Sequence, residues 1–255
     1  MEISGPAAQA LHSLSPAQIK LLESIPKAEL HAHLNGSIPL ATLKELASDY
    51  LAKTATSPGG VPNEAIKLGI EALTLGPKLN DITEFFVLFP AIYALTSTPS
   101  TLARATRAVL GVFLDGDVPQ CRYLELRTTP RQTDSMNREE YLRVVLCEMK
   151  RAGYTREQVS LIVSLDRRMD KDVLEECVGI ACKLRREGEW VVGVDLCGDP
   201  AAGDMNEFGP YFEKVKDAGL GLTVHIAEVT LFLWYNCLFL SVCVFRQQAI
   251  PEKKP

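Results

Sequence analysis

The stretch "KAELHAHLNGS", residues Lys27 to Ser37, places two histidines on either side of one alanine, directly after a short apolar run. Alternate side chains of a β-strand point to the same face, so His31 and His33 would point the same way at the end of a strand. Two imidazoles in this arrangement can bind one metal ion. The same short pattern also fits two polar residues that face solvent. Other residues of the chain are needed to distinguish a metal-binding pair from two exposed histidines.

Four further runs typical of β-strands follow, at residues 122–129, 159–165, 190–198 and 221–228. Amphipathic helical stretches separate them, at residues 40–53, 82–95, 101–114, 138–151, 171–186 and 207–217. Strands that alternate with helices predict a parallel sheet. The nearly continuous apolar character of the strands predicts that both faces of the sheet are covered. A serine-proline start predicts a short helix from Ser15 to about Ser24, and residues 54–65 are rich in Gly and Pro, which predicts a loop.

Both a doubly wound sheet and a (βα)8 barrel fit this order of elements. Barrel active sites lie at the C-terminal ends of the strands, and no glycine-rich phosphate loop opens a helix in this sequence. We therefore predict an α/β fold of the TIM (βα)8 barrel type, incomplete, with about five βα units. Residues able to do chemistry gather at those strand ends: His31, His33, Glu125, Arg127, Asp166, Asp195, His225 and Glu228.

The fifth strand ends in "VHIAE", residues 224–228, which would bring His225 to the same barrel mouth as the first two histidines. Three neutral imidazoles suit zinc and leave one position for water. Glu228 follows His225 closely and suits the general acid/base of metal-assisted hydrolysis. Taken alone, His225 fits a buried core histidine better than a metal ligand. The histidine pair in the first strand reverses this preference and favours a site for one Zn²⁺ ion. The predicted barrel is thus of the metal-dependent hydrolase type.

Composition narrows the functional class and the expected location. The 255 residues carry a net charge of -5, which argues against a nucleic acid polymer as partner. Seven cysteines without a CxxC pair do not form the pattern of a secreted disulfide framework. The N-terminus shows no secretory signal. We therefore expect a reduced, cytoplasmic protein.

Five motifs occur in order between about residues 25 and 228: "PKAELHAHLNGS", "YLELRTTPR", "SLDRR", "GVDLCGDP" and "VHIAE". In these motifs the chain resembles the adenosine deaminase family of zinc aminohydrolases, and more closely the branch that acts on N6-methyl-AMP. The resemblance implies that His31, His33 and His225 hold zinc. It also implies that Glu228 hands a proton to the purine ring while a zinc-activated water attacks C6, giving IMP and methylamine.

The resemblance also implies a set of substrate-binding residues. Classical adenosine deaminases carry Asp where this chain has Asn35, and a neutral amide there removes the repulsion of a 5′-phosphate. Gly198 would approach the purine through its backbone. Arg131 adds a cation, whereas Arg127 and Arg167 fit pairing with nearby carboxylates as well as contact with the substrate. The predicted set is His33, Asn35, Tyr93, Arg127, Thr128, Thr129, Pro130, Asp166 and Gly198, with Tyr93 standing where the nucleotide branch is expected to carry His.

We divide the chain into an N-terminal arm with a short helix (1–24), a truncated deaminase barrel (25–228) and a divergent hydrophobic tail (229–255). The tail contains no His and no Asp, whereas the resemblance implies three more strand-helix units with a water-orienting His and a zinc-binding Asp. We therefore expect a shortened deaminase with impaired activity, monomeric if complete. The alternative is a non-catalytic truncated isoform, or a tail-anchored remnant, without deaminase activity.

The tail itself leaves three interpretations open. Residues 229–245 form an almost uncharged run of 17 residues, at the lower limit for a membrane span. The alternatives are an aberrant terminus and a strand that pairs with the open sheet edge. Asn236 interrupts the run, and Glu228 of the predicted site lies directly before it. Membrane insertion would therefore unfold the site, so it is the least favoured of the three interpretations.

Overall fold

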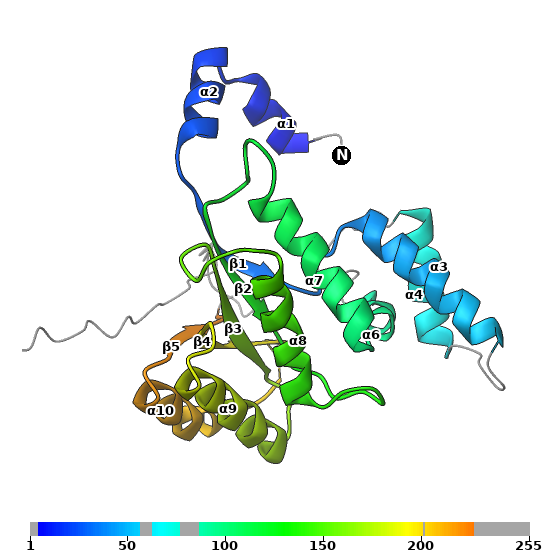
Figure 1. The fold of residues 1–255 in the computed structure, drawn as a ribbon, viewed down its shortest axis with the longest axis vertical. Helices are drawn as coiled ribbons and strands as arrows, with labels where there is room; N and C mark the ends of the chain where they lie inside the picture. The colour runs from blue at the N-terminus through cyan, green and yellow to red at the C-terminus, as the bar shows by residue number, and fades with distance from the viewer. Residues whose placement is uncertain (1–4, 57–62, 77–86, 201, 227–255) are drawn as a thin grey trace, which may run out of the picture.

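Five parallel strands form one curled sheet in the computed structural model, which describes residues 5–56, 63–76, 87–200 and 202–226. The strands lie side by side in chain order (Figure 1). They are β1 (Ala28–His33), β2 (Tyr123–Thr128), β3 (Val159–Asp166), β4 (Val191–Cys197) and β5 (Gly221–Val224). Although β1 and β5 are the two edges of the sheet, His31 and His225 approach to 2.7 Å between their Nε2 atoms. The sheet is therefore curled into half a barrel, as the predicted incomplete TIM barrel requires.

Four helices cover the outer face of this sheet and confirm most of the predicted helical stretches. They are α7 (Pro99–Leu114), α8 (Arg138–Arg151), α9 (Lys171–Arg186) and α10 (Gly209–Asp217). A short 3-10 turn, η1 (Met205–Glu207), precedes α10, so the helix expected from residue 207 begins two residues later. Pro210 lies in the first turn of α10, where a missing N–H is tolerated.

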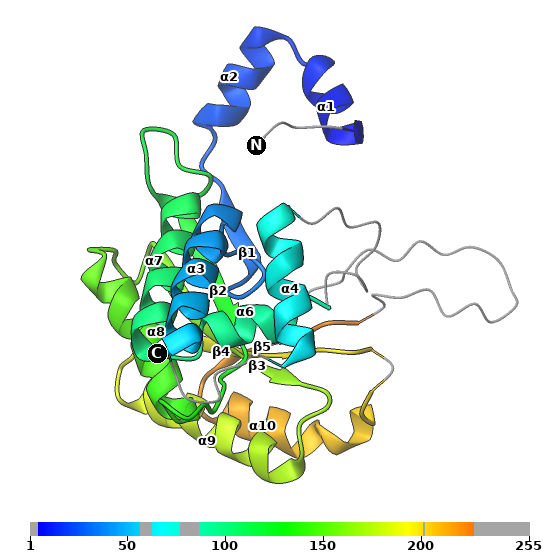
Figure 2. The same cartoon turned by 90° about the vertical axis from the view of Figure 1, so that its right-hand side faces the viewer.

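Three more helices lie between β1 and β2 in the sequence and pack together beside α7 (Figures 1 and 2). They are α3 (Leu40–Thr56), α4 (Glu64–Leu75) and α6 (Phe89–Leu95). The prediction lacked α4, which Asn63 caps by accepting a hydrogen bond from the Ile66 amide at 2.9 Å. The helix expected over residues 82–95 begins only at Phe89 within the described residues, because Pro90 favours the first turn.

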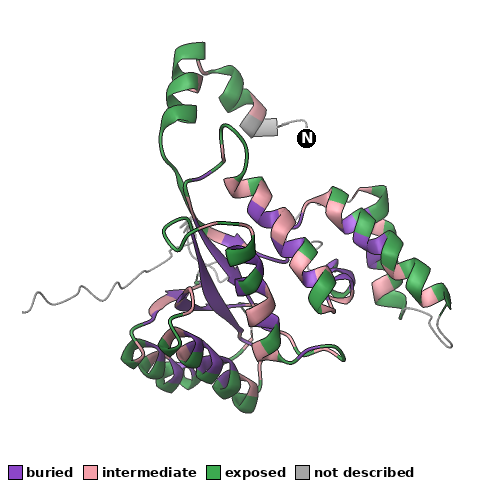
Figure 3. Cartoon of the chain, in the orientation of Figure 1, coloured by how far each residue is buried: buried purple, intermediate pink, exposed green. Residues whose placement is uncertain are grey.

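The N-terminal arm consists of α1 (Gly5–His12) and α2 (Pro16–Ser24) and projects from the rest of the molecule (Figure 2). The predicted start of α2 is confirmed, since Ser15 and Gln18 form a reciprocal capping box. No residue of α2 is buried, and the arm is mostly exposed in Figure 3. Helix α2 therefore adds nothing to the buried core.

The two faces of the sheet differ in chemistry although both are buried. Outward-pointing side chains are apolar and pack against the helices, among them Leu124, Leu126, Leu161, Val163, Leu165, Val194 and Leu196. Inward-pointing side chains are largely polar, among them Glu125, Arg127, Ser160, Ser164, Asp195 and Thr223. The register places Ser164 beside Asp195 and Asp195 beside Thr223. The polar inner face is where the predicted site lies.

No helix in the described ranges is long and apolar enough to cross a membrane. The five cysteines in those ranges are all free thiols. The hydrophobic run at residues 229–245 lies outside the described residues, and so does the centre of the loop expected at 54–65.

Candidate metal centre

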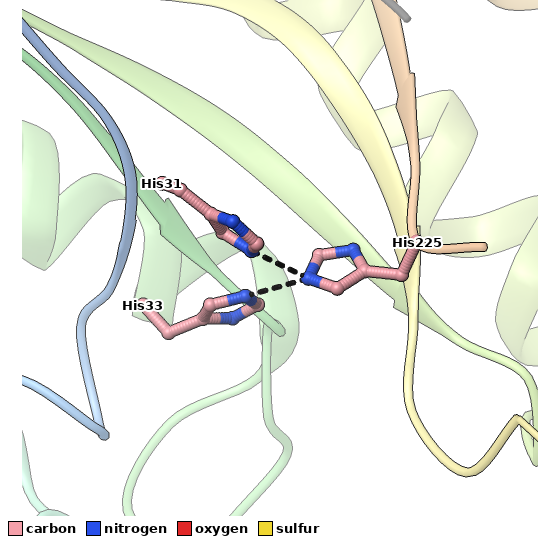
Figure 4. A group of neighbouring side chains, drawn as sticks. All are labelled: His31, His33 and His225. Carbon is pink, nitrogen blue, oxygen red and sulfur yellow. Dashed lines mark hydrogen bonds between the residues drawn. The ribbon is translucent and has the colours of Figure 1, made fainter. Parts of the chain in front are cut away.

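Three histidine side chains converge on the inner face of the half-barrel (Figure 4). Strand β1 supplies His31 and His33 on one face, and His225 follows the last residue of β5. The Nε2 atom of His225 lies 2.7 Å from that of His31 and 3.1 Å from that of His33. The structure thus brings together the three residues predicted to share one ion, and their role as ligands stays a prediction.

The spacing of the three imidazoles fits a zinc ion, and two of them are held in the neutral form. Burial lowers the pKa of His33 to about 3. Burial, followed by the nearby charge of Arg127, also lowers the pKa of His31. Both rings are therefore neutral at pH 7, the form that binds metals. Tetrahedral zinc with Zn–N bonds of about 2.0–2.1 Å holds its ligand nitrogens roughly 3.3–3.4 Å apart, so only small shifts are needed to surround one ion.

A buried ion pair lies beside the histidines on the inner face. The Arg127 guanidinium lies 3.0 Å from Asp195 Oδ1, and both side chains of this ion pair are almost completely buried. Arg127 also donates to Thr223 Oγ1 at 3.4 Å and to the backbone carbonyl of Leu30. Its predicted contact with the substrate stays a prediction. In this structure its two terminal nitrogens face protein acceptors, whereas its buried Nε has no hydrogen-bond partner among the described residues.

Asn35 and Thr128 belong to a buried hydrogen-bond network that also includes Tyr141 of α8 and Thr96. The Tyr141 hydroxyl lies 3.0 Å from Thr128 Oγ1 and donates to Asn35 Oδ1 at 3.3 Å. Thr96 donates its hydroxyl proton to the Ile92 carbonyl at 2.8 Å, so its oxygen accepts from the Asn35 amide at 3.4 Å. An amide donor at position 35 therefore has a local structural reason in addition to the predicted effect on a phosphate.

The ends of β3 and β4 bring together other predicted residues. Arg168 donates twice to the Asp166 carboxylate, at 3.0 and 2.8 Å. Burial opposes ionisation of Asp166, but the hydrogen bonds from Arg168 hold its pKa below the ordinary value. Gly198 has φ +98°, and a Cβ atom there would lie 2.6 Å from Asp166 Oδ1. Only glycine fits beside this carboxylate, and the predicted approach of Gly198 to a purine is not tested.

Tyr93 and Arg131 form a stacked pair near Asp166. The Arg131 guanidinium carbon lies 3.5 Å from the centre of the Tyr93 ring, a cation–π contact. Thr129 and Pro130 lead from β2 to Arg131, Thr129 half-buried and Pro130 buried. Arg167 donates to the His225 carbonyl at 2.6 Å, and within the part of the chain that the structure describes it forms no ion pair with a carboxylate.

One predicted site residue lies outside the described ranges, and one buried carboxylate at the site was not predicted. Glu228 lies outside the described residues, so its role as the catalytic acid/base stays a prediction. Asp195, although noted at a strand end, was not among the predicted site residues. Its signal in the sequence is a lone carboxylate within the apolar run "WVVGVDLCG", since a buried charge needs partners.

Known proteins provide an independent comparison. A family model described as "Adenosine deaminase" matches residues 26–232. The chain is 32% identical over 213 residues to the adenosine deaminase-like protein of Drosophila melanogaster, covering 82% of this chain and 59% of that protein. It is 32% identical over 220 residues to the N6-methyl-AMP deaminase of Homo sapiens, covering 84% and 58%. The chain therefore spans less than two thirds of the length of these relatives.

Among solved structures, the chain is similar to Arabidopsis ADAL complexed with IMP. The TM-score is 0.68 at 34% sequence identity, and the match covers 83% of this chain and 61% of that one. The five ordered motifs, the parallel half-barrel and the family match agree, and this chain belongs to the adenosine deaminase family.

Proposed function

We propose that this chain carries the zinc-binding and nucleotide-binding residues of a hydrolytic deaminase, and that its substrate is N6-methyl-AMP. In this reaction water supplies the oxygen at C6, the C6–N bond breaks, and the products are IMP and methylamine. The observation that carries the proposal is the convergence of three histidine Nε2 atoms on the inner face of the half-barrel. The names of the human relative and of the IMP-complexed structure support the choice of substrate.

His31, His33 and His225 would hold the ion. Zinc, when bound, would lower the pKa of a coordinated water so that it can serve as a nucleophile near pH 7. Glu228 would move a proton to the purine ring. The neutral state of His31 and His33 makes their lone pairs available to a cation.

Arg131 would bind the phosphate. Within the described residues its guanidinium forms no ion pair, and its stacking on Tyr93 holds it near Asp166. A guanidinium in this state can donate two parallel hydrogen bonds to a phosphate. Asp166 and Gly198 at the neighbouring strand ends would contact the nucleoside part. A cytoplasmic location and a monomeric state stay predictions.

The first experiment measures zinc per chain after chelation, reloading and desalting. We expect about one ion per chain for the wild type, since the three histidines form a single cluster, and a clear loss in His225→Ala. His12→Ala is the matched control, because His12 lies exposed on α1. Equal zinc content in all three proteins would contradict the proposed ligands.

The second experiment measures methylamine release from N6-methyl-AMP and from the corresponding nucleoside, with Glu228→Gln as the blank. We expect release above the blank and a preference for the nucleotide that falls in Arg131→Ala. No release above the blank from a zinc-loaded protein would overturn the proposed reaction. The expected impairment of the rate stays a prediction that the same assay tests against a longer relative.

A further inference from the structure

The Asp195 side chain on β4 contacts side chains from β2, β3, β5 and the residue after β5, through hydrogen bonds and one ion pair. Its Oδ1 lies 3.0 Å from His225 Nδ1, accepts from Thr223 Oγ1 at 2.7 Å and forms an ion pair with Arg127 at 3.0 Å. Ser164 Oγ donates to Oδ2 at 3.3 Å. The Asp195 carboxylate is completely buried, so its orientation is fixed by these donors from β2, β3, β5 and the residue after β5.

This carboxylate determines which nitrogen of His225 carries the proton. The carboxylate oxygen beside Nδ1 is Asp195 Oδ1, which already accepts from Thr223 and is paired with the Arg127 guanidinium. The second neighbour of Nδ1, the Leu196 carbonyl at 3.2 Å, has no proton and can only accept. A neutral His225 ring therefore carries its proton on Nδ1. Its Nε2 lone pair then faces His31 and His33.

Arg127 links the same carboxylate to the strand of the other two histidines. Its guanidinium binds Asp195 and also donates to the carbonyl of Leu30, the residue directly before His31. Strands β1 and β5 are not neighbours in the sheet, so no backbone ladder sets their relative position. The Arg127–Asp195 pair supplies a connection between them across the inner face.

We propose that Asp195 is a positioning residue of the metal site, which holds His225 as the Nδ1–H tautomer with Nε2 directed at the ion, while Arg127 ties Asp195 to β1. The inference rests on the metal-binding part of the proposed function. Partners of this kind orient a metal-binding histidine and raise its basicity, and their loss typically lowers metal affinity about 10- to 100-fold.

Two measurements test the proposal. The first is a ¹⁵N–¹H correlation spectrum of the histidine side chains in the zinc-free wild type, with His225 assigned by comparison with His225→Ala. We expect the proton on Nδ1 of His225. A proton on Nε2 would overturn the inference without any variant having to fold.

The second is zinc affinity by chelator competition for the wild type, Asp195→Asn and Asp115→Asn. Asp115 is the matched control because it pairs with Arg107 on the surface. We expect Asp195→Asn to bind zinc about 10- to 100-fold more weakly, with part of the His225 proton moved to Nε2, and Asp115→Asn to bind as the wild type does. Unchanged affinity in a folded Asp195→Asn would overturn the inference. A wild type that binds no zinc would instead overturn the proposed function, and the spectrum would still decide the tautomer.

Discussion

Leu126 and Arg127 are neighbours in β2, both fully buried, yet they show how the two faces of the sheet differ. Leu126 points outward into the apolar core that the helices cover. Arg127 points inward, where its terminal nitrogens contact Asp195, Thr223 and the Leu30 carbonyl. Apolar burial is favourable against almost any apolar neighbour. Burial of a charge is tolerated only beside particular partners.

The outer face of the sheet tolerates substitutions that the inner face does not. On the outer face, stability depends on filled volume, so a residue of similar size and polarity can replace another. On the inner face, each polar atom needs a donor or acceptor in one direction, and removal of one partner leaves another uncompensated. The partners that compensate the buried charges of the inner face also orient the histidines.

The largest effect is expected from Arg127→Met, which leaves the Asp195 carboxylate buried without its cation. Breaking a buried pair in this way lowers the free energy of unfolding by about 3–5 kcal/mol, measured by urea denaturation. The double variant Arg127→Met, Asp195→Leu removes both charges and is expected to be more stable than the single variant. A decrease of less than about 1 kcal/mol in the free energy of unfolding of the single variant would contradict this expectation. It would mean that the inner face tolerates the loss of a charge partner.

Leu126→Ala tests the other face, and we expect it to lower the free energy of unfolding by about 2–5 kcal/mol through the cavity that it leaves. The folded protein should still bind zinc as the wild type does, because Leu126 belongs to the apolar core on the face of the sheet opposite to the histidines. Leu75→Ala is the matched control, since Leu75 is 87% exposed. A loss of zinc affinity in folded Leu126→Ala would show that the two faces are not independent.

The outer face is also the part that the sequence predicts best. Apolar runs separated by amphipathic helices indicate a parallel sheet, and the strand period of two correctly places His31 and His33 on one face. The partners of Arg127 could not be predicted, because they come from β1, β4 and β5 and depend on the curl of the sheet. Helix α4 was missed because its apolar positions follow a Gly- and Pro-rich stretch that reads as a loop.

Asn35→Asp places a charge in a buried network of neutral polar groups. The Thr96 oxygen can only accept at this position, because its proton is donated to Ile92, so a carboxylate would face it without a hydrogen bond. We expect a loss of about 1–3 kcal/mol in the free energy of unfolding. Asn63→Asp is the control, since Asp caps a helix as well as Asn does.

The same variant also tests the phosphate interpretation of position 35. In an active relative, we expect Asn35→Asp to weaken activity on the monophosphate far more than on the nucleoside, because a carboxylate repels the phosphate. Equal losses on both substrates would leave the hydrogen bond to Thr96 as the reason for asparagine.

The smallest effect is expected from Arg104→Ala, which removes an ion pair of the same chemistry as Arg127 but in water. Arg104 of α7 binds Glu45 and Asp49 of α3, and its side chain is 42% exposed. Pairs of this kind contribute about 0–1 kcal/mol, because water solvates the separated charges nearly as well and salt screens them. We therefore expect a loss below about 1 kcal/mol in urea denaturation, and a smaller one in 1 M salt. A loss as large as that of Arg127→Met would mean that burial beside the histidines does not distinguish the two arginines, and that the ion pair itself determines the loss in both.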